Sequence, residues 1–329
     1  MQKKTLLAIE VVLSIAAIAA ILYFVGAQQV ISSLSRANLF FLLLAAFFYL
    51  LQGVLMAVRI NLLLENLNER LPLKKVISSH FAGMLASDFT PARTGYFTTA
   101  FALNINHKVS LDKAMVAILG PQMLDFIFKV AVGSLAVLFI IYSVGGFANN
   151  PQNMLGIVVG LAAIAFMVLI GLLTLFSKKF LGFISKFVLF PVFGKYVQKL
   201  VIFVNQIQDS SFVVVEKLPQ LLLLLAGLWV MKALEWYCYG IALGLNVNTT
   251  LPLIIFFAFL QPLIVMLQFV PTPTVAGAGV SEAGLALVLP LFLVPVPLAV
   301  AYGLVARFVP LLIDLVGVRE AVSAISPRS

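Results

Sequence analysis

Long apolar runs recur along the chain, and six of them are long enough to cross a bilayer as helices. A spanning helix needs roughly 20 mostly apolar residues. The six runs are Thr5–Val25, Ala37–Leu64, Leu111–Tyr142, Asn153–Phe176, Leu218–Leu245 and Pro297–Val316. Only 10% of the residues are charged, against about 25% in soluble domains. The sequence therefore predicts an all-α polytopic membrane protein with about six full transmembrane helices.

The first apolar run has a feature of its own, because Lys3 and Lys4 precede it and small residues follow it. That arrangement is also typical of a cleaved signal peptide. The run is about 20 residues long, which is enough to span a bilayer, and Glu10 interrupts it. These two properties favour a retained first helix, and a cleaved signal remains the alternative.

Two further apolar stretches, Leu73–Leu103 and Leu251–Leu293, are broken near their middles by Pro, Gly and Thr. Each is long enough to enter and leave the membrane on the same side as a re-entrant hairpin of two half-helices. Broken backbone in hydrocarbon survives only where protein or a water-filled cavity covers it. The breaking residues are Pro91 and Gly95 in the first stretch, and Pro271, Pro273, Gly277 and Gly279 in the second.

The two broken stretches belong to an internal repeat. Asn66–Pro91 aligns without a gap on Asn246–Pro271, with matching residues at both ends and at a Leu-Pro-Leu near the start. The helix before each copy crosses in the opposite direction, so the copies form an inverted repeat, with units 37–142 and 218–318. In transporters such repeats bring broken helices together near the bilayer midplane, where the substrate binds.

Basic residues are distributed unevenly between the loops. The chain has 21 Lys and Arg against 12 Asp and Glu, a net charge of +9. Most of them fall in alternate loops, which predicts cytoplasmic N- and C-termini in a single cell-membrane domain, residues 1–329. The lysine-rich segment 178–217 alternates Phe and Lys, which predicts amphipathic helices at the cytoplasmic interface. The charge fits anionic lipid, so no nucleic-acid partner is expected.

Ionisable residues inside membrane segments are functional candidates. We expect Arg59, Arg93 and Arg307 to bind a phosphate, because guanidinium groups suit that anion. We expect three carboxylates to hold the arginines or carry protons. The remaining candidates for the substrate site are Asp88, Asp125, Glu282, Ser281, Thr90 and Tyr96. Ser281 is expected to cap a returning half-helix whose free N–H groups attract an anion. The competing interpretation is that these are structural ion pairs holding the broken helices.

Metal and nucleotide sites are not predicted. The single cysteine, Cys238, allows no internal disulfide, and His80 and His107 are too isolated to suggest a metal site. The sequence contains no G-x-x-x-x-G-K-[ST] phosphate loop. We therefore expect no cofactor, and transport that is passive or coupled to an ion or to the membrane potential.

Several motifs resemble the lysylphosphatidylglycerol synthase transmembrane family. "PTPTVAGAGVSEAG" is similar to its Pro-Thr-Pro-Gly-Gly-x-Gly-x-x-Glu signature, and "DFTPARTG" to its Asn-x-x-Pro-x-Arg-x-Gly. Arg59, Asp125 and Arg307 match further charged positions of the family. The resemblance implies lipid flipping, and not lysyl transfer, since nothing similar to the aminoacyl-transfer domain is present. Tyr96 and Pro121-Gln122 stand where the family often has charged residues, which implies a different headgroup.

These observations lead to a functional hypothesis. The protein is expected to be a flippase or scramblase-like transporter, and not an enzyme, for an anionic headgroup of a phospholipid or polyprenyl-phosphate lipid. One alternative is an integral membrane glycolipid or polyprenyl-phosphate-lipid transferase. Another is an accessory subunit whose lysine-rich segment docks a cytoplasmic transferase. A homo-oligomer also fits the sequence.

Overall fold

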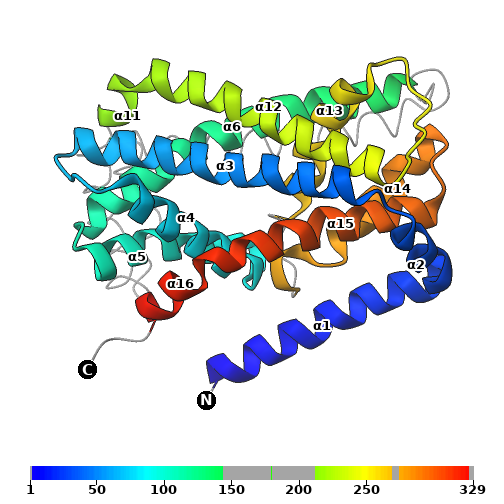
Figure 1. The fold of residues 1–329 in the computed structure, drawn as a ribbon, viewed down its shortest axis with the longest axis horizontal. Helices are drawn as coiled ribbons and strands as arrows, with labels where there is room; N and C mark the ends of the chain where they lie inside the picture. Colours follow the sequence, from blue (N-terminus) through cyan, green and yellow to red (C-terminus); the bar gives the residue numbers. More distant parts are fainter. Residues whose placement is uncertain (1, 144–178, 180–211, 269–273, 326–329) are drawn as a thin grey trace.

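The computed structural model describes residues 2–143, 179, 212–268 and 274–325. The predicted span Asn153–Phe176, nearly all of segment 178–217, and the break residues Pro271 and Pro273 lie outside these ranges. Within them every regular element is helical (Figure 1). The elements are α1 (Gln2–Val25), α2 (Ala27–Ser35), α3 (Leu39–Asn66), α4 (Leu73–Asp88), η1 (Pro91–Phe97), α5 (Thr98–His107), α6 (Leu111–Ser143), α11 (Phe212–Glu216), α12 (Leu218–Ala242), α13 (Leu253–Leu267), η2 (Val275–Gly277), α14 (Val280–Val288), η3 (Leu289–Phe292), α15 (Val296–Asp314), η4 (Leu315–Gly317) and α16 (Val318–Ile325).

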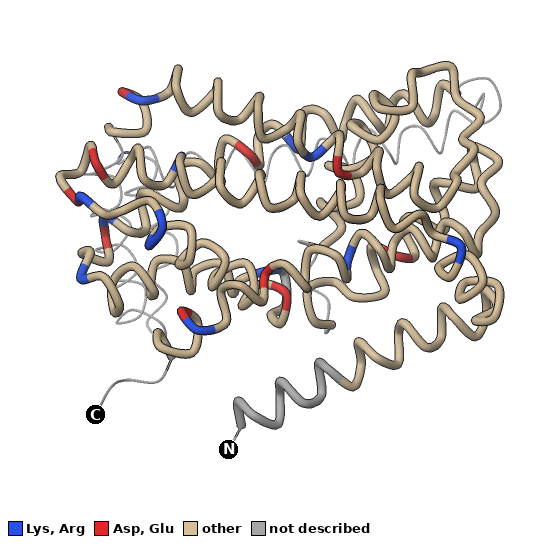
Figure 2. Tube along the Cα trace, viewed as in Figure 1, with Lys and Arg blue, Asp and Glu red and all other residues tan. Residues whose placement is uncertain are grey.

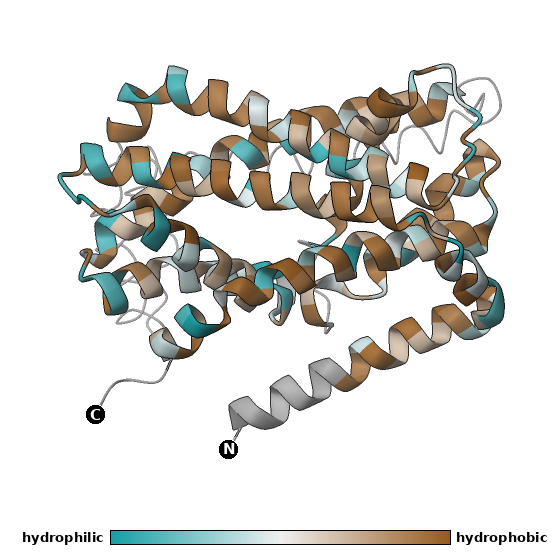
Figure 3. Ribbon diagram, viewed as in Figure 1, coloured by the Kyte–Doolittle hydropathy of each residue, from teal (hydrophilic) through white to brown (hydrophobic). Residues whose placement is uncertain are grey.

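Five helical stretches of the described residues are long and apolar enough to cross a membrane, or six if the bent pair α1–α2 counts as one. This confirms the predicted all-α polytopic membrane fold. The first predicted run, Thr5–Val25, lies within α1, and a bend of 93° follows it, between α1 and α2. Gly26 lies between them with φ of 98°, a conformation that favours glycine. Figure 3 shows apolar residues along the long helices and hydrophilic ones gathered towards the helix ends.

The antiparallel pair α3–α12 organises the bundle. At one end the Asn38 N–H donates to the Ala242 carbonyl at 2.8 Å. At the other end the Asn66 side-chain amide donates to the Glu216 carboxylate at 3.2 Å. The start of α3 therefore lies beside the end of α12, and the end of α3 lies beside the start of α12. Asn38 also caps α3 by accepting from the Phe40 N–H, which satisfies one of the free donors of the first turn.

The first broken stretch folds back on itself at η1, so that α4 and α5 pack side by side (Figure 1). The stretch begins at the end of the bundle where α3 ends. Gly83 allows this packing, because a Cβ there would overlap the Thr99 side chain and the Tyr96 carbonyl. Gly95 has the same function at the bend, since its Cβ would overlap the backbone of Ala86. The two predicted half-helices are therefore held together by close backbone contacts.

The second broken stretch begins at the opposite end of the bundle, where α12 ends. Its returning half, α14 and η3, comes back to that end, where the Asn248 N–H donates to the Phe292 carbonyl at 3.0 Å. The tips of the two stretches touch: the Ala276 N–H donates to the Thr90 carbonyl at 3.2 Å. The hairpins therefore enter from opposite ends and meet inside the bundle. The common origin implied by the sequence repeat stays a prediction.

Two peripheral helices complete the described fold. In Figure 1, α1 lies apart from α15 along much of its length. Its contact with the core is specific, because the Ser14 hydroxyl accepts a hydrogen bond from the Val275 N–H at 2.7 Å. At the far end of the chain, α16 packs on α4 and α5. There the Asn106 amide donates to the Glu320 carboxylate at 2.9 Å. Each broken stretch is thus held by one peripheral helix.

Candidate functional site

A cavity of about 550 Å³ lies where the two hairpin tips meet. Its walls come from α1, α3, α4, η1, α6, α12, α13, η2 and α15, and its lining is mostly apolar. Charged side chains interrupt this lining. Figure 2 shows charged positions in the middle of the bundle as well as at the helix ends. The charged lining residues are Asp88, Arg93, Asp125, Lys129, Lys232, Glu235 and Arg307. Charged side chains within the apolar helices of a membrane protein are costly and are functional candidates by default.

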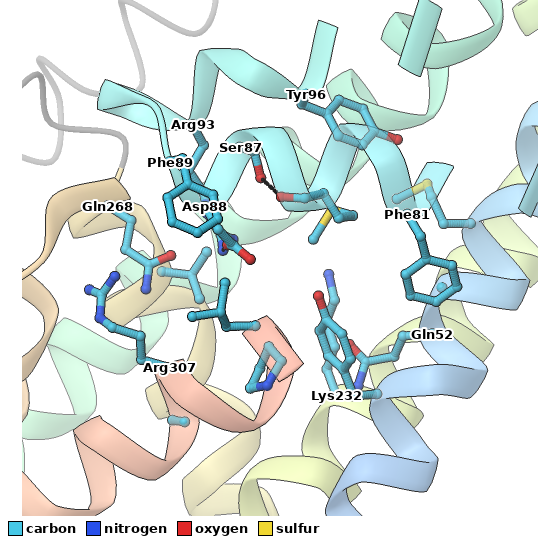
Figure 4. Close-up of a pocket in the computed structure, with 18 of the residues that line it drawn as sticks. Gln52, Phe81, Ser87, Asp88, Phe89, Arg93, Tyr96, Lys232, Gln268 and Arg307 are labelled. Atoms are coloured by element: carbon cyan, nitrogen blue, oxygen red, sulfur yellow. Dashed lines mark hydrogen bonds and ion pairs between the residues drawn. The ribbon is translucent and has the colours of Figure 1, made fainter. Parts of the chain in front are cut away.

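Arg93 reaches the cavity from the first tip. Its guanidinium forms an ion pair with Asp88 at 2.9 Å, and the Arg93 side chain stays 23% exposed. The backbone φ of Arg93 is 57°, a left-handed conformation that costs energy in any residue with a Cβ. Among the described residues, neither Arg93 Nε nor Asp88 Oδ2 has a hydrogen-bond partner. Both atoms are buried, and Figure 4 shows the two side chains beside the cavity near Phe89 and Gln268.

Arg307 reaches the cavity from α15 and is tied to the second tip. It pairs with Glu282 at 2.5 Å, donates to the Ser281 hydroxyl at 2.7 Å, and donates to the Gly277 carbonyl at 3.3 Å. Of Arg307, Glu282 and Ser281, only Arg307 lines the cavity. Glu282 and Ser281 are buried behind the lining. The second tip thus holds the guanidinium through three groups.

The expected cap of the returning half-helix was wrong. The N-cap of α14 is Gly279, whose N–H donates to the Glu282 carboxylate at 2.8 Å. Gly279 has φ of 86°, and the helix starts two residues earlier than a Ser281 cap requires. Ser281 instead donates to Glu282 at 3.1 Å. The start of α14 therefore already holds an internal carboxylate, which competes with any outside anion for its N–H groups.

Arg59 does not line the cavity. Its side chain is fully buried and pairs with Asp125 at 2.6 Å, while a second nitrogen donates to the Pro121 carbonyl at 3.0 Å. Asp125 does line the cavity, and its other oxygen lies 3.9 Å from Lys232 Nζ. Each of the three candidate arginines is thus paired with one of the three candidate carboxylates. Two of the arginines face the cavity, and Arg59 supports a carboxylate from behind.

Thr90 and Tyr96 differ in position. Thr90 accepts a hydrogen bond from the Gly95 N–H at 2.6 Å and donates to the Ala86 carbonyl at 3.1 Å, so it stabilises the bend. It does not line the cavity, whereas Tyr96 does. The Tyr96 hydroxyl lies 3.3 Å from Nδ1 of His80.

Sequence reasoning left several lining residues without a role. Lys129 lies one helical turn after Asp125, and Lys232 lies three residues before Glu235, spacings that place each pair on one helix face. Glu235 accepts hydrogen bonds from Gln52 at 2.5 Å and from Tyr239 at 2.8 Å. The i, i+3 and i, i+4 spacings were the available signal. Four glutamines also line the cavity without any such pattern: Gln52, Gln122, Gln261 and Gln268.

Comparison with known proteins identifies the family. The family model described as the lysylphosphatidylglycerol synthase TM region matches residues 7–317. The chain belongs to this family. It is also similar to UPF0104 membrane protein PH1989 of Pyrococcus horikoshii, with 27% identity over 172 residues, which cover 51% of this chain and 49% of that protein. The matched segment thus spans about half the length of this curated relative. The family predicted from the motifs is confirmed, and the protein is a multi-pass membrane protein.

Proposed function

We propose that this protein is a flippase or scramblase-like transporter that moves a phosphate-bearing lipid headgroup through the central cavity. One observation carries the proposal: two broken hairpins from opposite ends of the bundle meet at one cavity whose mostly apolar lining carries charged side chains. Arg93 comes from the first tip, and Arg307 is bonded to the second. A ligand bound between them is in contact with both hairpins at once.

The physical case rests on desolvation. Moving a charged headgroup from water into hydrocarbon has a large unfavourable free energy, because the headgroup loses its hydration. This cost makes unassisted flipping slow. Charged side chains on the cavity lining lower this cost, because they replace part of the water around the headgroup. Guanidinium groups bind phosphate through two parallel hydrogen bonds, which makes Arg93 and Arg307 suitable for this purpose. Asp88 and Glu282 hold the arginines in place while the cavity is empty.

The acyl chains need a path that stays in the bilayer, and we place it beside α1. Ser14, Ile15 and Ile18 of α1 contribute to the cavity lining. Ile15 is nevertheless 64% exposed, so this helix covers the cavity with one face and presents the other to the surroundings. A displacement of α1 would open the cavity laterally without disturbing the pair α3–α12.

The proposal includes a location and an orientation. The ends of α3 and α5 and the start of α4 share one end of the bundle, where Lys74, Lys75, Lys108 and Lys113 gather. The opposite end carries Arg36. The excess of lysines supports a plasma membrane topology with both termini cytoplasmic.

Reconstitution into liposomes tests the proposal. Acyl-labelled fluorescent phosphatidylglycerol is bleached from outside, and inner-leaflet lipid becomes bleachable only if the protein moves it. We expect movement with the wild type and strong loss with Arg93→Gln and Arg307→Gln. Arg36→Gln, an exposed arginine, is the matched control and should behave as wild type. No movement above protein-free liposomes contradicts the proposal, and a chemically altered lipid in the same vesicles points to a transferase.

A further inference from the structure

Two carboxyl groups from different helices meet beside the first tip. Asp88 is the last residue of α4, and Asp314 is the last residue of α15. Their carboxyl groups lie close enough for a hydrogen bond between them. Asp314 is fully buried, whereas Asp88 lines the cavity. Gly317, just after Asp314, keeps this end of α15 against α4, because a Cβ there would overlap the backbone of Phe81 and Ala82. The meeting of the two acids is therefore fixed by backbone packing.

The charges around the two acids do not balance. Arg93 of η1 forms an ion pair with Asp88 at 2.9 Å. Asp314 accepts instead from the Tyr49 hydroxyl of α3, a neutral group, which lies 2.8 and 3.0 Å from its two oxygens. Tyr49 and Arg93 are the groups of other elements that face the pair, within the described part of the chain. Two ionised acids and one guanidinium would therefore leave one negative charge in a buried place.

The other ionisable groups on the neighbouring helices face different partners. Arg319 of α16 is exposed. The remaining groups are engaged as follows: Glu282 with Arg307, Glu235 with Gln52 and Tyr239, Lys129 and Lys232 with Asp125, and Glu320 with His107. The excess negative charge at Asp88 and Asp314 is therefore a local property of this pair.

A proton is the simplest way to remove that charge. Two carboxylates in contact cannot both stay ionised without a large repulsion, and such pairs share one proton. The position of both acids at helix C-terminal ends adds to the repulsion, because the helix dipole is negative there. Oδ2 of Asp88 is buried and meets no donor among the described residues. A proton held between the two acids supplies a donor and leaves the group neutral.

We propose that Asp88 and Asp314 form a shared proton-binding site that couples lipid movement to proton transport. This inference rests on the proposed function and names its energy source. A phosphodiester carries one negative charge, and it competes with Asp88 for the guanidinium of Arg93. Uptake of a second proton from cavity water then restores neutrality. One proton therefore moves with each lipid, in the same direction.

Infrared spectroscopy of the purified protein tests the site without requiring transport. A protonated carboxyl group has a carbonyl band that carboxylates lack and that shifts in D2O. Near neutral pH, Asp88→Asn and Asp314→Asn should each lose the same part of this band, because the proton belongs to the pair. Glu69→Gln, which removes the acid of the more exposed ion pair with Lys113, is the control and should keep the whole band. A band that is unchanged in either aspartate variant overturns the inference.

Liposomes with a pH gradient test the coupling. A trace of acyl-labelled phosphatidylglycerol reports how the lipid is distributed between the leaflets. One proton per lipid predicts that a gradient of one pH unit shifts the leaflet ratio about tenfold, towards the alkaline side. Asp314→Asn should lose this response, and Glu69→Gln should keep it. A wild-type ratio that ignores the pH gradient, or that follows a sodium gradient instead, overturns the inference.

The two measurements separate this inference from the proposed function. Wild-type protein that moves lipid with no response to the pH gradient supports transport and overturns the coupling. Wild-type protein that moves no lipid contradicts the proposed transport and the coupling with it. In that case an infrared band lost in both aspartate variants still supports the proton site itself.

Discussion

The buried pair Arg59–Asp125 gives the clearest test of how the cavity wall is built. The two side chains are 0% and 2% exposed, with nitrogen and oxygen 2.6 Å apart. For charge centres about 4 Å apart, Coulomb's law at an effective dielectric constant of 20 gives about 4 kcal/mol. Removing one partner leaves a charge buried without compensation, which typically costs 3–5 kcal/mol. We expect Arg59→Met and Asp125→Asn each to lower the free energy of unfolding by about that amount.

The double variant distinguishes charge pairing from general packing. Arg59→Met combined with Asp125→Asn removes both charges, so it should cost clearly less than the sum of the single variants. The assay is reversible denaturation in mixed micelles, followed by helical circular dichroism. The control pair is Lys113–Glu69, which has a similar distance of 2.9 Å but side chains 32% and 24% exposed. Breaking it should cost less than about 1 kcal/mol. Additive costs in the double variant, or equal costs for the buried and exposed pairs, would refute the reasoning.

Three further variants test the hairpins and their supports. Gly95→Ala places a Cβ against the backbone of Ala86, so we expect a lower thermal midpoint and faster proteolysis at the first tip; unchanged values would contradict the close approach. Glu282→Gln weakens the hold on Arg307 and should reduce lipid movement in liposomes, while full activity would show that this carboxylate is dispensable. Ser14→Ala leaves a buried backbone N–H of η2 without its acceptor and should lower stability by about 1–3 kcal/mol. Equal stability of Ser14→Ala and wild type would show that α1 does not anchor the second tip.

The sequence was sufficient to predict the long helices, because these depend on the hydrophobicity averaged over about 20 residues. The runs that became α3, α6 and α12 are continuous and apolar, and the structure places these helices within three residues of the predicted ends. The break at Pro91 and Gly95 was visible because both residues are unsuited to a helix interior. The bend at Gly26 was missed, since a single glycine at the end of an apolar run does not fix an angle.

The parts of the site that depend on packing were not accessible from the sequence. Whether Arg59 faces the cavity or α6 is decided by the rotation of α3 against its neighbours. The cap of α14 lies two residues before the expected Ser281, at Gly279, whose N–H donates to the Glu282 carboxylate. Gln261 gave no signal, because one polar residue in an apolar helix has no periodicity. Only the folded structure places it on the cavity lining.

The most direct test of the account is the density of bound lipid in nanodiscs that contain a phosphate-bearing lipid, determined by electron microscopy. The account predicts phosphate density within hydrogen-bonding distance of both Arg93 and Arg307, with acyl chains leaving the cavity beside α1. A phosphate bound elsewhere on the protein, with the space between these two arginines filled only by water or side chains, would contradict it.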